Sequence, residues 1–189
     1  MLFRSIYVVD VAGGRPRPLP TLPGADNVAP SWSRDGKSIY FTSDYKSGLF
    51  DLWRVPLPNG SPVRVTSNGG VYGVESVDGR FLYYAKLEAP GVWRRSLNGG
   101  EETRILDKSG GILWYDWALA RDGIYFLDTA AKPKEAIEFL DFESGKITPV
   151  IYPDKPVIWG VSLSPDGRHI LYVQTDLFQS SLVLVKNFH

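Results

Sequence analysis

The chain has 189 residues, and its 21 Lys and Arg balance its 21 Asp and Glu, so its formal net charge is zero. This balance argues against direct contact with nucleic acid, because domains that bind DNA or RNA carry a basic patch or a high pI. The absence of cysteine excludes disulfides and thiolate metal sites. No run approaches the roughly 20 apolar residues of a membrane helix. We therefore expect a globular domain that does not insert into a membrane, suited equally to the cytoplasm and the periplasm.

Four Asp-Gly pairs recur along the chain at intervals of 43 to 44 residues. They are Asp35-Gly36, Asp78-Gly79, Asp122-Gly123 and Asp166-Gly167. A period of about 40–45 residues is typical of one four-stranded blade of a β-propeller. Each Asp-Gly pair lies between two short β-prone runs, which indicates a hairpin turn. The sequence thus predicts an all-β fold made of four-stranded antiparallel blades.

In chain order, residues 1–5 match no repeat position and are interpreted as a remnant of cloning or sequence assembly. Residues 6–20 match the third and outer strands of a partial blade. Four blades follow, at about 28–67, 70–107, 112–151 and 158–189. The third unit has two residues fewer between its turn and its aromatic strand, so we expect its hairpin to be the tightest. No segment shows helical periodicity, and we predict no helix.

The strands expected at the two ends of the chain do not combine into one complete blade, as a closed ring would require. The N-terminal partial blade offers two strands, while the last blade, whose third strand is expected at 182–185, lacks only an outer strand. A complete ring should not have that surplus. We favour the interpretation that the chain is the C-terminal part of a longer propeller, and the alternative is a self-contained four-bladed ring. Open blade edges should then favour self-association.

Residues 30–44, which read Pro-Ser-Trp-Ser-Arg-Asp-Gly-Lys-Ser-Ile-Tyr-Phe-Thr-Ser-Asp, closely resemble the TolB-type, WD-like propeller repeat. Residues 163–172 are a second close copy, and the resemblance covers residues 6–187. It implies that residues 6–189 form a TolB-like β-propeller with about four blades of a six-bladed ring. The ending from Ser164 to Phe188 resembles the closing blade of bacterial proteins in which such a propeller follows a winged-helix DNA-binding domain or a serine/threonine kinase.

The residue patterns of common catalytic and metal sites are missing from the sequence. A Gly-x-Ser-x-Gly nucleophile elbow does not occur, and the two histidines, His169 and His189, lack metal-ligand spacing. The turn aspartates have two interpretations, as repeated Ca²⁺ ligands or as caps of their own turns. Capping accounts for all four at once, and we favour it. We therefore expect no enzyme activity, no cofactor and no metal.

One aromatic group is the candidate binding site. It comprises Tyr72, Trp114, Tyr115, Trp117 and Trp159. These residues fall at comparable positions of the innermost strands, where loops converge on the channel mouth. Trp and Tyr are enriched at binding hot spots, so the group is a candidate funnel for a peptide or a glycan. The alternative is that the rings fill contacts between blades.

These observations predict a non-catalytic propeller module that binds a protein, a peptide or another ligand. With the resemblance of its closing blade, we expect the C-terminal sensory or interaction part of a bacterial signalling or transcriptional regulator. One alternative is the propeller domain of a prolyl-oligopeptidase-like peptidase. A second is a TolB-like periplasmic envelope protein. The presence of an accompanying DNA-binding, kinase or peptidase domain would separate these possibilities.

Overall fold

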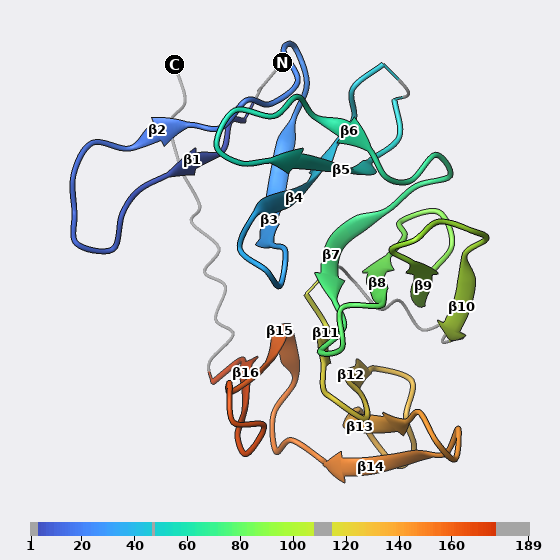
Figure 1. Ribbon diagram of the computed structural model, residues 1–189. Helices are drawn as coiled ribbons and strands as arrows, with labels where there is room; N and C mark the ends of the chain where they lie inside the picture. The colour runs from blue at the N-terminus through green and yellow to red at the C-terminus, as the bar shows by residue number, and fades with distance from the viewer. Residues whose placement is uncertain (1–3, 47, 108–114, 177–189) are drawn as a thin grey trace, which may run out of the picture.

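The computed structural model describes residues 4–46, 48–107 and 115–176, together with all their side chains except that of Trp159. Within these ranges the chain forms sixteen strands and no helix (Figure 1). It also contains none of the long apolar helices that spanning a bilayer requires. The strands build three four-stranded antiparallel sheets and two two-stranded ones.

The strands follow the order of the repeat. The N-terminal hairpin is β1 (Tyr7–Val8) and β2 (Arg17–Pro18). The first blade is β3 (Asn27–Trp32), β4 (Ser38–Ser43), β5 (Asp51–Pro56) and β6 (Val63–Arg64). The second is β7 (Val71–Glu75), β8 (Phe81–Ala85), β9 (Val92–Ser96) and β10 (Thr103–Leu106). The third is β11 (Trp117–Leu119), β12 (Gly123–Asp128), β13 (Ala136–Asp141) and β14 (Ile147–Ile151). The fourth is described by β15 (Val157–Leu163) and β16 (Ile170–Gln174).

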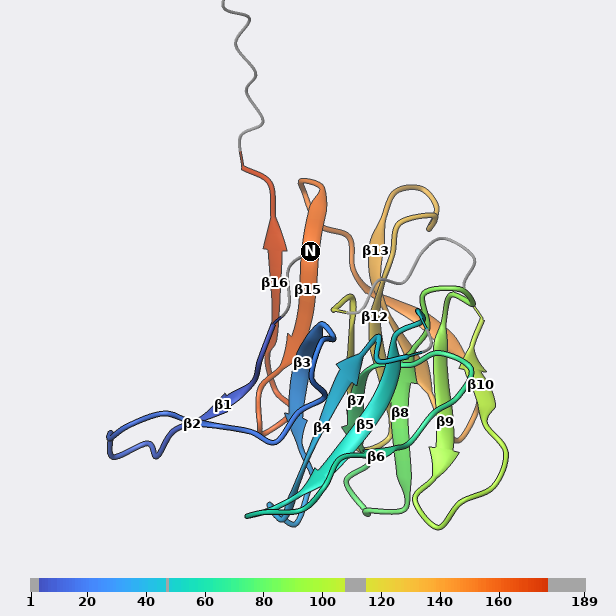
Figure 2. The ribbon, with the colours of Figure 1, turned by 90° about the horizontal axis from the view of Figure 1, so that it is seen from above.

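The sheets stand around a common axis, with the first strand of each blade innermost. Figure 1 looks along this axis onto β3, β7, β11 and β15, and Figure 2 shows the same blades from above. The predicted fold class, an all-β propeller of four antiparallel blades, is confirmed. The strand expected at 182–185 lies outside the described residues. Membership of a six-bladed ring stays a prediction.

The Asp-Gly hairpins owe their shape to a serine two residues before the aspartate. Ser33 Oγ donates to Asp35 Oδ1 at 2.7 Å, and it accepts from the N–H of Ser38 at 2.8 Å. The N–H of Lys37 donates to the same carboxylate oxygen at 3.0 Å. The same serine-to-aspartate bond recurs in the second and fourth blades, at Ser76–Asp78 and Ser164–Asp166. Capping of the turn by its own aspartate is confirmed at these three positions.

The third hairpin has a different turn. Ala120 stands where the other blades have serine, and its N–H donates to the carbonyl of Gly123 at 2.9 Å. The corresponding bond in the first blade joins residues five apart, from Ser33 N–H to the carbonyl of Ser38. The third hairpin is therefore the tightest of the four, as the two missing residues predicted.

Apolar side chains from neighbouring blades form the core in separate clusters. Tyr40 and Leu52 of the first blade pack with Leu82 and Tyr84 of the second. A second cluster joins the second and third blades through Tyr83, Val92, Trp117 and Phe126, and a third joins the third and fourth through Leu127, Ile137, Val157 and Val161. Ile6 and Leu19 of the N-terminal hairpin pack on Ile39, Phe41 and Val55. Since burying each large apolar side chain contributes roughly 1.5–3 kcal/mol, these contacts hold the blades in place.

Candidate binding surface at the channel mouth

Three innermost strands bend at the same repeat position. Ala29, Tyr72 and Gly160 all have positive φ, at 49°, 54° and 77°. Each lies six residues before the aspartate of its own Asp-Gly turn. At or next to each of these residues, the pairing between the first and second strands of the blade shifts its register. Left-handed backbone is uncommon for alanine and tyrosine and is costly unless the surroundings hold it. Sequence analysis missed this bend, because only Gly160 is a residue type that favours it.

Neighbouring blades hold the bend in place by hydrogen bonds to its backbone. The N–H of Tyr72 donates to Thr42 Oγ1 of the first blade at 3.3 Å. The N–H of Gly160 donates to Asp116 Oδ1 of the third blade at 3.4 Å. Asp116 occupies the equivalent position in its own blade, and its carbonyl accepts from the N–H of Leu127 at 2.8 Å. The start of β7 is therefore tied to the first blade, and the start of β15 to the third.

The fold brings Tyr72, Tyr115 and Trp117 together. The ring centroids of Tyr72 and Trp117 are 5.6 Å apart in an edge-to-face arrangement, and those of Tyr72 and Tyr115 are 6.2 Å apart. Edge-to-face and tilted arrangements suit the quadrupoles of aromatic rings. Trp114 and the side chain of Trp159 lie outside the described residues, so the structure places three of the five predicted site residues side by side.

These three aromatic residues differ in what they offer to a ligand. Trp117 is fully buried in the cluster between the second and third blades, and its Nε1–H has no partner among the described residues. Its contacts match the alternative interpretation, in which a ring fills the space between blades. Tyr72 is half-buried, and burial raises the pKa of its hydroxyl. Tyr115 is 47% exposed, and it is the ring that a ligand can reach.

The backbone that carries Tyr115 is anchored to the fourth blade. The carbonyl of Tyr115 accepts from the N–H of Val161 in β15 at 2.7 Å. The following residue, Asp116, is buried and bonds to both β12 and the start of β15. An exposed ring on a fixed backbone loses little conformational entropy when it binds. The arrangement can therefore present Tyr115 as a preorganised contact.

Residues 4–46, 48–107 and 115–176 contain no group of three or more His, Asp or Glu side chains placed to hold a metal ion. His169 immediately precedes β16, and its backbone N–H donates to Ser164 Oγ at 2.9 Å. His189 lies outside the described residues. The described part of the channel mouth offers aromatic rings and hydroxyls to a ligand.

Solved structures show which proteins share this fold. A crystal structure of TolB from Acinetobacter baumannii superposes with a TM-score of 0.72 and 22% identity over 91% of this chain. A TolB-named protein from Agrobacterium tumefaciens gives a TM-score of 0.68, also at 22% identity, over 90% of this chain. The fold is that of a TolB-like β-propeller. No family model and no curated protein matches the chain.

The TolB-like fold also occurs in proteins with other activities. A gluconolactonase from Xanthomonas campestris superposes with a TM-score of 0.68 at 14% identity over 90% of this chain. The chain spans 43% of the Acinetobacter TolB, 66% of the Agrobacterium protein and 62% of the gluconolactonase. At these identities the likeness establishes the fold alone, since one propeller scaffold supports many functions.

Proposed function

We propose that this TolB-like propeller is a non-catalytic binding module that takes a protein or peptide ligand at its channel mouth. The observation that carries the proposal is the half-exposed ring of Tyr115, held on an anchored backbone beside Tyr72. Tyrosine supplies a large contact area at low entropic cost and adds a hydroxyl for hydrogen bonding. In this proposal the chain is the C-terminal sensory or interaction part of a bacterial signalling or transcriptional regulator.

A TolB-like envelope protein is the second candidate. It is favoured by the superposition on the Acinetobacter TolB, which covers nearly the whole of this chain. The reading frame upstream of Met1 in the source DNA separates the two candidates. Further repeats preceded by a winged helix or a kinase would support the regulator. Further repeats preceded by another domain and a signal peptide would support the envelope protein, and a hydrolase domain downstream would support the peptidase alternative.

Peptide selection tests the binding function directly. A random peptide library is panned on the purified chain, and the dissociation constant of a selected peptide is measured for the wild type and Tyr115→Ala. We expect Tyr115→Ala to weaken binding at least about tenfold, which corresponds to about 1.4 kcal/mol. Tyr152→Ala is the matched control, because Tyr152 is 39% exposed and follows β14, the outermost strand of the third blade.

Two results would contradict the proposal. Equal loss of affinity in the Tyr115 and Tyr152 variants would place the selected peptides elsewhere than the channel mouth. Saturable hydrolysis of a sugar lactone by the purified chain would contradict the non-catalytic part, since a gluconolactonase shares the fold.

A further inference from the structure

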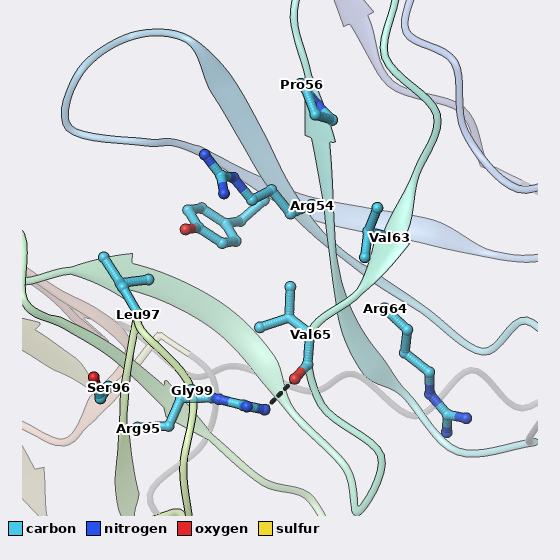
Figure 3. A pocket seen from close by; sticks show the side chains of 10 residues that line it. Arg54, Pro56, Val63, Arg64, Val65, Arg95, Ser96, Leu97 and Gly99 are labelled. Atoms are coloured by element: carbon cyan, nitrogen blue, oxygen red, sulfur yellow. Dashed lines mark hydrogen bonds between the residues drawn. The ribbon is translucent and has the colours of Figure 1, made fainter.

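A pocket of about 260 Å³ lies between the first and second blades (Figure 3), and none of Tyr72, Tyr115 and Trp117 lines it. We call it the inter-blade pocket. Its principal lining residues are Arg54, Val63, Arg64, Val65, Arg95 and Leu97. The two valines and Arg64 come from the segment of the outermost strand β6, while Arg95 and Leu97 come from β9 and the turn after it. The pocket therefore combines apolar walls with the side chains of Arg54 and Arg95, while the guanidinium of Arg64 points away from them (Figure 3).

Arg95 breaks the pattern of the repeat. In the first and third blades, the residues at this position of the third strand are Val55 and Leu140, as their pairing with Ile39 and Ile124 shows. Both are buried in the core between blades. The equivalent residue in the second blade, paired with Leu82, is Arg95. A charged residue at a position that other blades fill with an apolar one points to function rather than packing.

The side chain of Arg95 reaches across to the first blade. Its Nη1 donates to the carbonyl of Val65, as the dashed line in Figure 3 shows. This bond holds the guanidinium at the edge of the pocket and uses one of its five N–H donors. The remaining donors are available to a ligand with paired acceptors, such as a carboxylate.

The charges around the pocket are not balanced. None of the residues that line it is acidic. Arg64 is neutralised by the buried carboxylate of Asp51 at 2.5 Å. Arg54 is exposed and lies 6.0 Å from the ring of Tyr40, and neither Arg54 nor Arg95 forms an ion pair with any carboxylate in the described ranges. Arg54 interacts electrostatically with Asp35, which lies beyond the pocket on the same side of the blade contact. Arg95 therefore carries the main uncompensated charge of the pocket, and Arg54 adds to it at the exposed rim.

The rim of the pocket is an open strand edge. β6 is the outermost strand of its sheet, and its Val63 is 59% exposed. An extended peptide can add to such an edge by main-chain hydrogen bonds while alternate side chains enter a neighbouring pocket. The pocket is smaller than the roughly 300–1,000 Å³ typical of small-molecule sites. Its size therefore suits one or two side chains of a peptide.

We propose that the inter-blade pocket binds an extended acidic segment of a partner protein, with its carboxylates on Arg54 and Arg95 and its apolar side chains on Val63, Val65 and Leu97. The argument for this occupant is charge complementarity, because the pocket is positive and apolar and contains no carboxylate of its own. This surface is distinct from the channel mouth, so the two proposals stand or fall separately.

Fluorescence anisotropy with defined probes tests the proposal. The first probe is a labelled decapeptide in which glutamate alternates with valine or leucine, and the second carries glutamine in place of every glutamate. We expect the glutamate peptide to bind at least about tenfold more tightly, and its affinity to fall as salt screens the charges. Arg54→Gln and Arg95→Leu should each weaken its binding about tenfold. Arg168→Gln, which removes an exposed charge from the fourth blade, should change the affinity less than about twofold.

Arg95→Leu also checks that lost binding is not lost folding. Because it restores the apolar residue type found at Val55 and Leu140, we expect the urea midpoint of the variant to equal or exceed that of the wild type. Equal affinity for the two peptides, or equal effects of Arg54→Gln and Arg168→Gln, would overturn the proposal. Binding to phosphatidylserine vesicles without binding to the glutamate peptide would also overturn it, and would assign the pocket to a membrane surface.

Discussion

Tyr40 and Tyr84 are buried, and the hydroxyl of each donates a hydrogen bond to a glutamate. Tyr40 donates to Glu75 Oε1 across the first blade boundary at 2.7 Å, and Tyr84 donates to Glu102 Oε2 at 2.6 Å. Burial, followed by the bond to the carboxylate, raises the pKa of both hydroxyls. Each glutamate has a second donor, the N–H of Arg34 for Glu75 and the ammonium of Lys86 for Glu102. These bonds give each buried tyrosine hydroxyl a fixed acceptor.

Trp117 provides a prediction at the scale of single residues. The Trp117→Ala variant leaves a large cavity between the second and third blades, so we expect it to lose about 3–5 kcal/mol of unfolding free energy. Trp32→Ala is the control, because Trp32 is 55% exposed, and we expect a change below about 1 kcal/mol. Urea unfolding followed by tryptophan fluorescence and circular dichroism measures both. A small loss for Trp117→Ala would mean that this side chain is not a core residue.

At the scale of elements, the four hairpins occupy the same place in the repeat, but different hydrogen bonds stabilise their turns. The serine hydroxyl, the turn aspartate and the next backbone N–H groups form one network at Asp35, Asp78 and Asp166. These bonds lower the pKa of each carboxyl, chiefly through the serine hydroxyl and a backbone N–H. Asp122 recurs at the same period but follows Ala120, so its hairpin closes without the network.

The network predicts a loss of stability in acid. The pKa of Asp78 is lowered from 3.8 to about 2 in the folded chain, so folding favours the carboxylate. Its contribution is present above the unfolded pKa and is lost as the pH falls through the folded pKa. We therefore expect the urea midpoint of the wild type to fall between about pH 4 and about pH 2. The urea midpoint of Asp78→Asn should fall less steeply over this pH range, because asparagine does not titrate.

Ser76→Ala is the matched control for the acid measurement. It removes the hydroxyl that contributes most to the lowered pKa of Asp78, so its dependence on pH should lie between those of Asp78→Asn and the wild type. Identical slopes for all three proteins would show that the hairpin network does not couple stability to pH.

At the scale of the whole molecule, the first and fourth blades each expose a large apolar side chain at a position that contacts the neighbouring blade elsewhere in the repeat. Leu171 holds the position of Tyr40 and Tyr83 and is 68% exposed, whereas both tyrosines are buried against the following blade. Trp32 holds the position of Glu75, which bonds to the preceding blade. Figure 1 shows β16 and the first blade on opposite sides of the gap between the last and the first blade.

These complementary faces predict self-association of the 189-residue chain. Leu171 of one copy can pack on Trp32 of another, since the equivalent residues Tyr40 and Glu75 meet between adjacent blades. The N-terminal hairpin covers a different part of the first blade, at Ile39, Phe41 and Val55. We expect light scattering to show dimers or larger species whose fraction rises with concentration, and Leu171→Asp to shift them to monomers. Tyr152→Asp, on the outer rim of the third blade, should leave the distribution unchanged. Monodisperse wild-type monomers across the series would contradict the prediction.

The sequence alone was sufficient for the repeat, its strands and its turns. The Asp-Gly period, the aromatic second strands and the two-residue deletion before Ile124 all concern interactions between residues a few positions apart, which a local pattern records. The capping of Asp35 and the tight third hairpin followed for the same reason. Grouping Tyr72, Tyr115 and Trp117 was also within reach, because equivalent positions of a repeat meet around a common axis.

Only the tertiary structure decided which of these rings is accessible and where the charges go. Trp117 and Tyr115 are close in sequence but differ in environment. Trp117 is buried against the second blade, whereas Tyr115 faces solvent. The left-handed backbone of Ala29 and Tyr72, and the reach of Arg95 to Val65, have no local signature. The bonds from Tyr72 to Thr42 and from Arg95 to Val65 join different blades, and each pair of residues lies 30 positions apart in the chain. Packing between sheets, which no single segment encodes, therefore determined both candidate binding surfaces.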